Sequence, residues 1–153
     1  MPYSIDTSAF LDAWVRNYPF DVFPTIWQQM DAAARNGTLL ASDEVLRELE
    51  KKEDGAYVWA KDRQEMIEAL DSEVEGHVRD IMQRYPRLVD TKKGRSVGDP
   101  FVIAIARLRN LTVITAEAAT GRIDAPRIPD VCHDLGIGWI RMLDFFREQK
   151  WSV

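Results

Sequence analysis

Apolar positions in the first third of the chain predict strands and helices in alternation. The run PYSID ends in an acid at Asp6 and is followed by apolar residues at helical spacing, so we expect a strand and then a helix. A second helix should begin near Pro24 and end before Gly37, because proline suits a helix start and glycine a helix end. The short apolar run TLLAS then predicts a strand, and Ser42 can cap the helix that follows it.

The remainder of the chain continues this alternation. From about 57 to 84 the apolar residues keep a helical period, which predicts one long helix or a broken pair. A polar, basic loop, TKKGRSVGDP, leads to FVIAIARL, a helix apolar on nearly every side and therefore expected to be central. LTVIT is short and β-branched, which is typical of a parallel strand covered on both faces. The last expected elements are a helix, a strand and a helix, at 128–135, 137–140 and 142–148.

This order of elements predicts an α/β fold with a mostly parallel central sheet flanked by helices. The chain has 153 residues, a length that usually forms one hydrophobic core, and it shows no internal repeat, low-complexity tract or linker. We therefore expect a single domain over residues 1–153.

Composition and charge narrow the functional classes. Apolar residues make up 46% of the chain, which is ample for a core. The single cysteine fits a reducing compartment, and neither a secretory signal nor a membrane-length apolar run is present, so we expect a cytoplasmic protein. A net charge of −5 argues against nonspecific coating of nucleic acid. It permits a nuclease, because an acidic site is itself negative until a cation binds there.

Four acids fall where the predicted sheet and helices could bring them together. Asp6 and Glu117 each follow a predicted strand, and the carboxyl ends of parallel strands share one edge of a sheet. Glu48 lies about two turns into the helix after Ser42, and Asp99 opens the central helix. Spacing alone leaves a second interpretation open, in which these acids are solvated or cap helices.

A cluster of carboxylates would point to a hard divalent cation. Carboxylates brought close together repel one another unless a positive charge compensates them. Mg²⁺ and Mn²⁺ prefer oxygen ligands and commonly retain waters, which leaves positions for a phosphate oxygen and an attacking water. Such a site suits hydrolysis of phosphodiester bonds.

Four segments of the chain together resemble the PIN-domain family. IDTSAFL resembles the family's opening strand and first acid. SDEVLRELEKK resembles the family's strand-to-helix segment, which carries a helical Glu. GDPFVIAIA resembles the third acid and central helix, and VITAE the last strand and fourth polar position. The whole chain is most similar to a PIN-like subgroup of bacterial proteins without an assigned function, whose nearest well-understood relatives are the VapC-like toxin ribonucleases.

The resemblance implies a three-layer PIN-like fold and a ribonuclease (a hydrolase) that depends on Mg²⁺ or Mn²⁺. It assigns catalytic and metal-binding roles to Asp6, Glu48, Asp99 and Glu117. The fourth position is commonly Asp, so the longer arm of Glu117 could bind metal through water or not at all. Glu44 is another acid on the same helix as Glu48 but fits the motif less well. The polar positions expected to hold the carboxylates or a water are Thr7, Ser8 and Thr115.

The implied partners follow from the same resemblance. We expect an RNA substrate that is cut at internal phosphodiester bonds and an antitoxin protein that restrains the toxin. We expect no association with a membrane, and we allow for a homodimer. Basic side chains near the acids could contact the RNA backbone or belong to ordinary solvated loops. They are Lys92, Lys93, Arg95, Arg122 and Arg127. Tryptophans could stack on bases, although aromatic residues at helical spacing more often lie in the core. These are Trp27, Trp59, Trp139 and Trp151.

Other chemistries have less support. Cys132-His133 is one adjacent pair without the arrangement of a nucleophile and its base, and His77 lies within an amphipathic helix. A haloacid-dehalogenase-like phosphatase would need a second Asp at Ser8, and a receiver domain would need paired early acids and a late lysine. The main non-enzymatic alternative is a catalytically inactive PIN-like module that binds RNA or protein.

Overall fold

Five parallel strands form one sheet, in the order β3-β2-β1-β4-β5. The computed structural model describes residues 2–89 and 98–152. The strands are β1 (Tyr3–Ile5), β2 (Leu39–Ser42), β3 (Ile67–Glu68), β4 (Thr112–Ile114) and β5 (Trp139–Ile140). Tyr3 pairs with Leu39 on one side and with Thr112 on the other, so β1 lies at the centre of the sheet.

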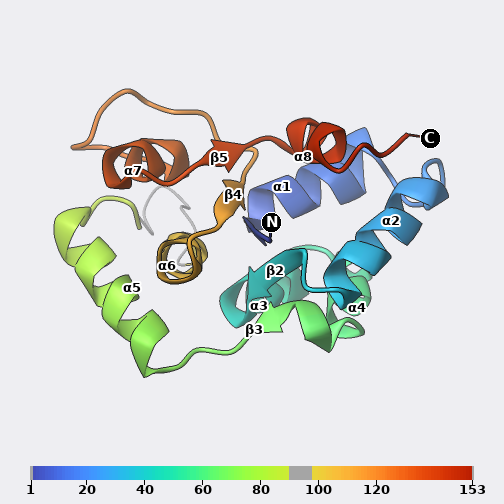
Figure 1. Cartoon of the computed structure of the whole chain (residues 1–153), viewed down its shortest axis with the longest axis horizontal. Helices are drawn as coiled ribbons and strands as arrows, with labels where there is room; N and C mark the ends of the chain where they lie inside the picture. Colours follow the sequence, from blue (N-terminus) through green and yellow to red (C-terminus); the bar gives the residue numbers. More distant parts are fainter. Residues whose placement is uncertain (1, 90–97, 153) are drawn as a thin grey trace.

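Helices cover both faces of this sheet (Figure 1). Between β1 and β3 the chain forms α1 (Thr7–Leu11), the π-helix η1 (Asp12–Asn17), α2 (Pro24–Arg35), α3 (Asp43–Lys52), α4 (Asp54–Lys61) and the short 3₁₀-helix η2 (Gln64–Met66). The later helices are α5 (Ser72–Arg84), α6 (Asp99–Arg109), α7 (Ile128–Leu135) and α8 (Met142–Glu148). The predicted α/β class, with its parallel sheet between helices, is confirmed.

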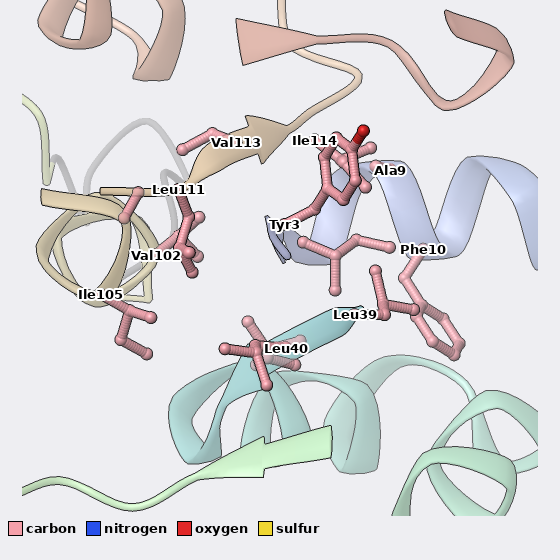
Figure 2. Close-up of a cluster of buried hydrophobic side chains, with 14 of the residues drawn as sticks. Tyr3, Ala9, Phe10, Leu39, Leu40, Val102, Ile105, Leu111, Val113 and Ile114 are labelled. Atoms are coloured by element: carbon pink, nitrogen blue, oxygen red, sulfur yellow. The ribbon is translucent and has the colours of Figure 1, made fainter. Parts of the chain in front are cut away.

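The residues of β1 show how the two faces are covered. Ser4 Oγ donates a hydrogen bond to the carbonyl oxygen of Val102 in α6, 3.0 Å away. Tyr3 points to the other face, where its ring packs edge-on against Phe145 of α8 with 4.8 Å between the ring centroids. All three residues of β1 are buried, as expected of a central parallel strand. Figure 2 shows the apolar side chains of β1, β2, β4, α1 and α6 in this core.

An aromatic cluster joins α1 and η1 to α2 and α4. Phe10, Trp27 and Trp59 pack with ring centroids 5.1 to 5.6 Å apart, and all three are buried. Trp14 adds an edge-on contact to Trp27 at 4.8 Å. Trp27 and Trp59 are therefore core residues, and neither is available to stack on bases.

Over 57–84 the helices form a broken pair, α4 and α5, which is one of the two expected arrangements, but a strand that the pattern did not predict lies between them. α4 ends at Lys61, and Ile67–Glu68 form the edge strand β3, which pairs with Ala41 and Ser42. α5 starts only at Ser72, where the Asp71 side chain accepts a hydrogen bond from Val74 N at 2.9 Å. Two residues of edge strand are too short to interrupt a helical period visibly, so the pattern could not reveal them.

The order in which the strands are added to the sheet reverses between β1 and β4. From β1 the chain moves outward to β2 and β3, and it then returns past β1 to β4 and β5. Crossovers of one hand place helices on both faces of such a sheet, with α6 on one face of β1 and α8 on the other. In open sheets of this kind, ligands bind beyond the carboxyl ends of the two strands at the switch. Within the described residues, none of the helices is long and apolar enough to cross a membrane.

Candidate metal centre

Three carboxylates meet at the switch between β1 and β4. Asp6 directly follows β1, Asp99 is the first residue of α6, and Glu117 lies three residues beyond β4. One carboxylate oxygen from each lies within 4.8 Å of the other two. Among the described residues, these three could hold a metal ion, because the donors are hard oxygens at a spacing that one ion can bridge.

Asp6 is the most deeply placed of these acids. It is 1% exposed, and its Oδ2 accepts hydrogen bonds from Ser8 Oγ and from Thr115 Oγ1, the latter at 2.9 Å. Burial, followed by the charge of Glu117, raises the pKa of Asp6 to about 7, although these hydrogen bonds oppose the shift. The predicted role of Ser8 and Thr115 as supports of a carboxylate is thus what the geometry provides.

Glu117 is held from two directions. Its backbone N–H donates to Thr115 Oγ1 at 3.1 Å, and its Oε1 accepts from the N–H of Ile128, the first residue of α7, also at 3.1 Å. The amino end of a helix favours negative charge, so α7 fixes one oxygen of this side chain. Ser8 Oγ also accepts from Ala116 N at 3.1 Å, which ties the segment after β4 to α1.

Glu48 lies beside this trio and outside it. It is buried on α3, and its Oε1 accepts a hydrogen bond from Thr7 Oγ1 at 3.0 Å. Its charge is close enough to contribute to the raised pKa of Asp6. The oxygens that converge within 4.8 Å in the described part of the chain are those of Asp6, Asp99 and Glu117, so Glu117 is more central than expected and Glu48 more peripheral.

The trio opens into a pocket of about 410 Å³. One wall is formed by α1 and η1 and another by the junction of α3 and α4, while the carboxylates lie deep between them. Sequence reasoning missed two cations that line this pocket, Arg16 and Lys52, because nothing in the local sequence distinguishes either one from an ordinary solvated side chain. The side chains that line the walls are Thr7, Ser8, Leu11, Asp12, Val15, Arg16, Lys52 and Glu53.

The loop that carries Glu117 is fixed by a further acid that sequence reasoning missed. Asp130 is 8% exposed and accepts hydrogen bonds from the backbone N–H groups of Thr120, Gly121 and Arg127, at 2.8 to 3.1 Å. Thr120 Oγ1 adds another at 3.0 Å. Burial would raise the pKa of Asp130, but the backbone donors outweigh it and lower the pKa.

The remaining predicted candidates lie elsewhere. Cys132 is buried, and burial together with the charges of Asp6 and Glu117 raises the pKa of its thiol to about 12, so it is no thiolate nucleophile. His133 and Arg122 line a separate pocket of about 330 Å³ beside α7, together with Trp139. Glu44 forms an ion pair with Arg47 on the surface of α3. The predicted rim residues Lys92, Lys93 and Arg95 lie outside the described residues.

Fold and site together define a PIN-like α/β protein with an acidic cluster that could bind metal. The chain belongs to the family described as Domain of unknown function (DUF4411), whose model matches residues 3–153. Among solved structures it is similar to a chain in the crystal structure of VapBC2 from Rickettsia felis bound to a DNA fragment from their promoter. The identity is 15% and the TM-score 0.55, over 92% of this chain and 98% of that one, a likeness that concerns the fold. A search of curated proteins finds no match.

Proposed function

We propose that this protein is a metal-dependent endoribonuclease. The observation that carries the proposal is the convergence of Asp6, Asp99 and Glu117 within 4.8 Å, from three separate elements, at the switch of a PIN-like sheet. Keeping three carboxylates so close, two of them buried, costs free energy through desolvation and repulsion. A site of this kind is favoured when a cation binds there.

The proposed ion is Mg²⁺ or Mn²⁺, because the donor set contains only carboxylate oxygens. When bound, such an ion supplies the Lewis acidity that activates an attacking water and offsets charge on the leaving oxygen. The chain's own groups would do the rest. Asp6, Asp99 and Glu117 would hold the ion, Ser8 and Thr115 would orient Asp6, and Glu48 would add negative charge beside it.

We further propose that the ribonuclease is the toxin of a toxin–antitoxin pair. The support is the sequence resemblance to VapC-like toxins and the similarity in fold to a chain of the VapBC2 structure. RNA is then the substrate and an antitoxin protein the partner.

A cleavage assay tests the catalytic part of the proposal. Purified protein should cut a mixture of labelled single-stranded RNAs in Mn²⁺ or Mg²⁺ and should lose this activity in EDTA. Asp99→Asn should reduce cleavage at least ~100-fold, since it keeps the size of the side chain and removes a proposed ligand charge. Asp43→Asn is a suitable control, because Asp43 is on the surface of α3, outside the pocket.

Metal binding and folding must be measured on the same variants. Titration calorimetry with Mn²⁺ should detect binding to the native chain and weaker binding to Asp99→Asn, while both melt cooperatively. Cleavage that is equal in both, or that persists in EDTA, would contradict the proposal. Metal-independent RNA binding without cleavage would instead favour the inactive binding module.

A further inference from the structure

The pocket above the carboxylates is a cleft with two walls and a charged rim. The wall formed by α1 and η1 contributes Leu11, Val15 and Arg16, and the opposite wall contributes Lys52 and Glu53 from the α3–α4 junction. Asp6 and Asp99, at the bottom, are 1% and 2% exposed. Among the described residues, these walls flank the opening through which a ligand can approach the acids.

The two walls of the pocket are in contact with each other between η1 and α4. A Cβ atom placed on Gly55 of α4 would lie 3.1 Å from Cζ2 of Trp14 in η1, so the two elements are in van der Waals contact there. The volume of about 410 Å³ lies at the lower end of the range for small-molecule sites, roughly 300–1,000 Å³. The size of the pocket favours a ligand of about one nucleotide at a time, such as a strand with unstacked bases, over a stacked duplex.

Two cations at the rim, Arg16 and Lys52, can contact a phosphate, and they lie beside the acids Asp12 and Glu53. Arg16 and Lys52 are the cations among the described residues that line the cleft, and both are exposed. Arg16 pairs with Asp12 at 2.9 Å, but the Arg16 side chain is 75% exposed, and a surface pair of this kind is weak enough to exchange for a phosphate. Beside them Val15 is 52% exposed and provides an apolar surface for a base or ribose.

We propose that this cleft binds a single strand of RNA, with Lys52 and Arg16 contacting a backbone phosphate next to the one presented to the acids. The inference rests on the proposed ribonuclease function and names the side chains that bind the RNA backbone beside the acids. Metal at the acids would offset the charge of the cleaved phosphate, whereas the neighbouring phosphate needs protein cations.

Charge reversal at two adjacent lysines gives a matched test. Lys52 lines the cleft, and Lys51 is exposed on the same helix but does not line it, so Lys52→Glu and Lys51→Glu change net charge equally. Binding of a fluorescent single-stranded oligoribonucleotide would be measured by anisotropy over a range of salt in Ca²⁺, a hard cation that binds carboxylate oxygens. Lys52→Glu should raise Kd about tenfold or more and reduce the salt slope by about one, whereas Lys51→Glu should change Kd less than about threefold.

A second pair repeats the comparison without charge reversal. Arg16→Gln should weaken binding, and Arg47→Gln, at an exposed ion-paired arginine of α3, should not. A hairpin duplex should bind more weakly than the single strand to the native chain. Equal effects of the paired variants, equal affinity for the duplex, or no RNA binding would each overturn the inference.

Cleavage kinetics separate this inference from the proposed function. If the native chain cuts RNA and Lys52→Glu leaves KM unchanged, the cleft assignment fails while the nuclease stands. If no RNA is cut but binding depends on Lys52 and not on Lys51, the nuclease fails while the cleft assignment stands.

Discussion

Asp6 is a carboxyl group whose ionisation opposes folding of the metal-free protein. Its folded-state pKa of about 7 exceeds the ordinary value of 3.8, because burial and then Glu117 disfavour its charge. Because the folded chain binds this proton more tightly than the unfolded chain does, protonation of Asp6 stabilises the fold, and this stabilisation is fully present below the unfolded pKa. That stability is lost as the pH rises through the folded pKa, so the charged site is a cost near neutrality and above.

The corresponding prediction concerns the pH dependence of stability. In EDTA, Asp6→Asn should be more stable than the native chain above pH 7, by roughly 1 kcal/mol or more, a melting-temperature difference of about 2–4 °C for a chain of this size. The difference should shrink as the pH falls from 7 toward about 4, because the carboxyl of the folded chain becomes protonated over this range. Differential scanning fluorimetry across this pH range measures it.

Metal provides the control for this prediction. Mn²⁺ should raise the melting temperature of the native chain at pH 8 and should not raise that of Asp6→Asn, because ligand binding stabilises only a chain that can bind. An advantage of Asp6→Asn that stays constant with pH would contradict the assignment of the titration to Asp6.

At the scale of elements, the amino end of α7 organises the loop between β4 and α7. Asp130, in the first turn of α7, binds the backbone of Thr120, Gly121 and Arg127, and the next N–H, of Ile128, binds Glu117. One helix terminus thus positions the loop and one acid of the trio. Only the folded loop brings these donors to the two carboxylates.

Asp130→Asn should therefore affect stability and the site together. The side-chain amide of Asn has one acceptor oxygen and cannot accept all the hydrogen bonds that the Asp130 carboxylate accepts. Each lost buried hydrogen bond costs ~1 kcal/mol, so we expect a loss of about 2 kcal/mol in the free energy of unfolding. Mn²⁺ affinity should fall as Glu117 loses its fixed position. Asp124→Asn is the control on the same loop, because Asp124 is 70% exposed and pairs with Arg122 at the surface. Unchanged stability and Mn²⁺ affinity in Asp130→Asn would contradict this role.

The contact between η1 and α4 permits a second prediction at this scale. Gly55→Ala would place a methyl group 3.1 Å from Trp14 Cζ2, so one wall of the cleft must shift by a few tenths of an ångström. We expect a loss of about 1 kcal/mol in the free energy of unfolding from this overpacking. We also expect a raised KM for RNA.

Gly76→Ala on α5 is the matched control for this substitution. A Cβ there meets nothing within 4 Å, and alanine is the better helix former, so this variant should gain roughly 0.5–1 kcal/mol. Equal stability changes in the two glycine variants, measured by urea unfolding, would show that the Trp14 contact is unimportant.

At the scale of the whole molecule, the toxin proposal requires that the intact chain harm the cell that makes it. Expression in a bacterium should arrest growth, expression of Asp6→Asn should not, and the product of a neighbouring gene should relieve the arrest. Growth curves with matched protein amounts test this. Harmless overproduction of a folded, nuclease-active chain would contradict the toxin role and leave the nuclease role unaffected.

Three aromatic side chains, Phe10, Trp27 and Trp59, are in the core and are not available to such a partner. The exposed large apolar side chains of η1, of α4 and of the turn before α2 are Val15, Val58, Phe20 and Val22. Burial of aromatic rings between α1, α2 and α4 could not be read from helical spacing, because the same spacing serves a core and a docking face.

The sequence by itself determined the alternation of strands and helices and the positions of the acids at element ends. α7 and α8 have the bounds expected from the sequence, and α6 begins at Asp99 as its position predicted. These features depend on local periods and on proline and capping residues, which a short window of sequence contains. The edge strand β3 and the π-helix η1 have no such local signal.

Only the tertiary structure decided which acids meet. The pairing of β1 with β4 brings Asp6, Thr115 and Glu117 together across more than a hundred residues, and α6 adds Asp99. The hydrogen bond from Thr7 holds Glu48 to one side, and Asp130 and the cations of the cleft join the site through loop and helix packing. These relations depend on strand order and side-chain direction, which no single segment of the sequence encodes.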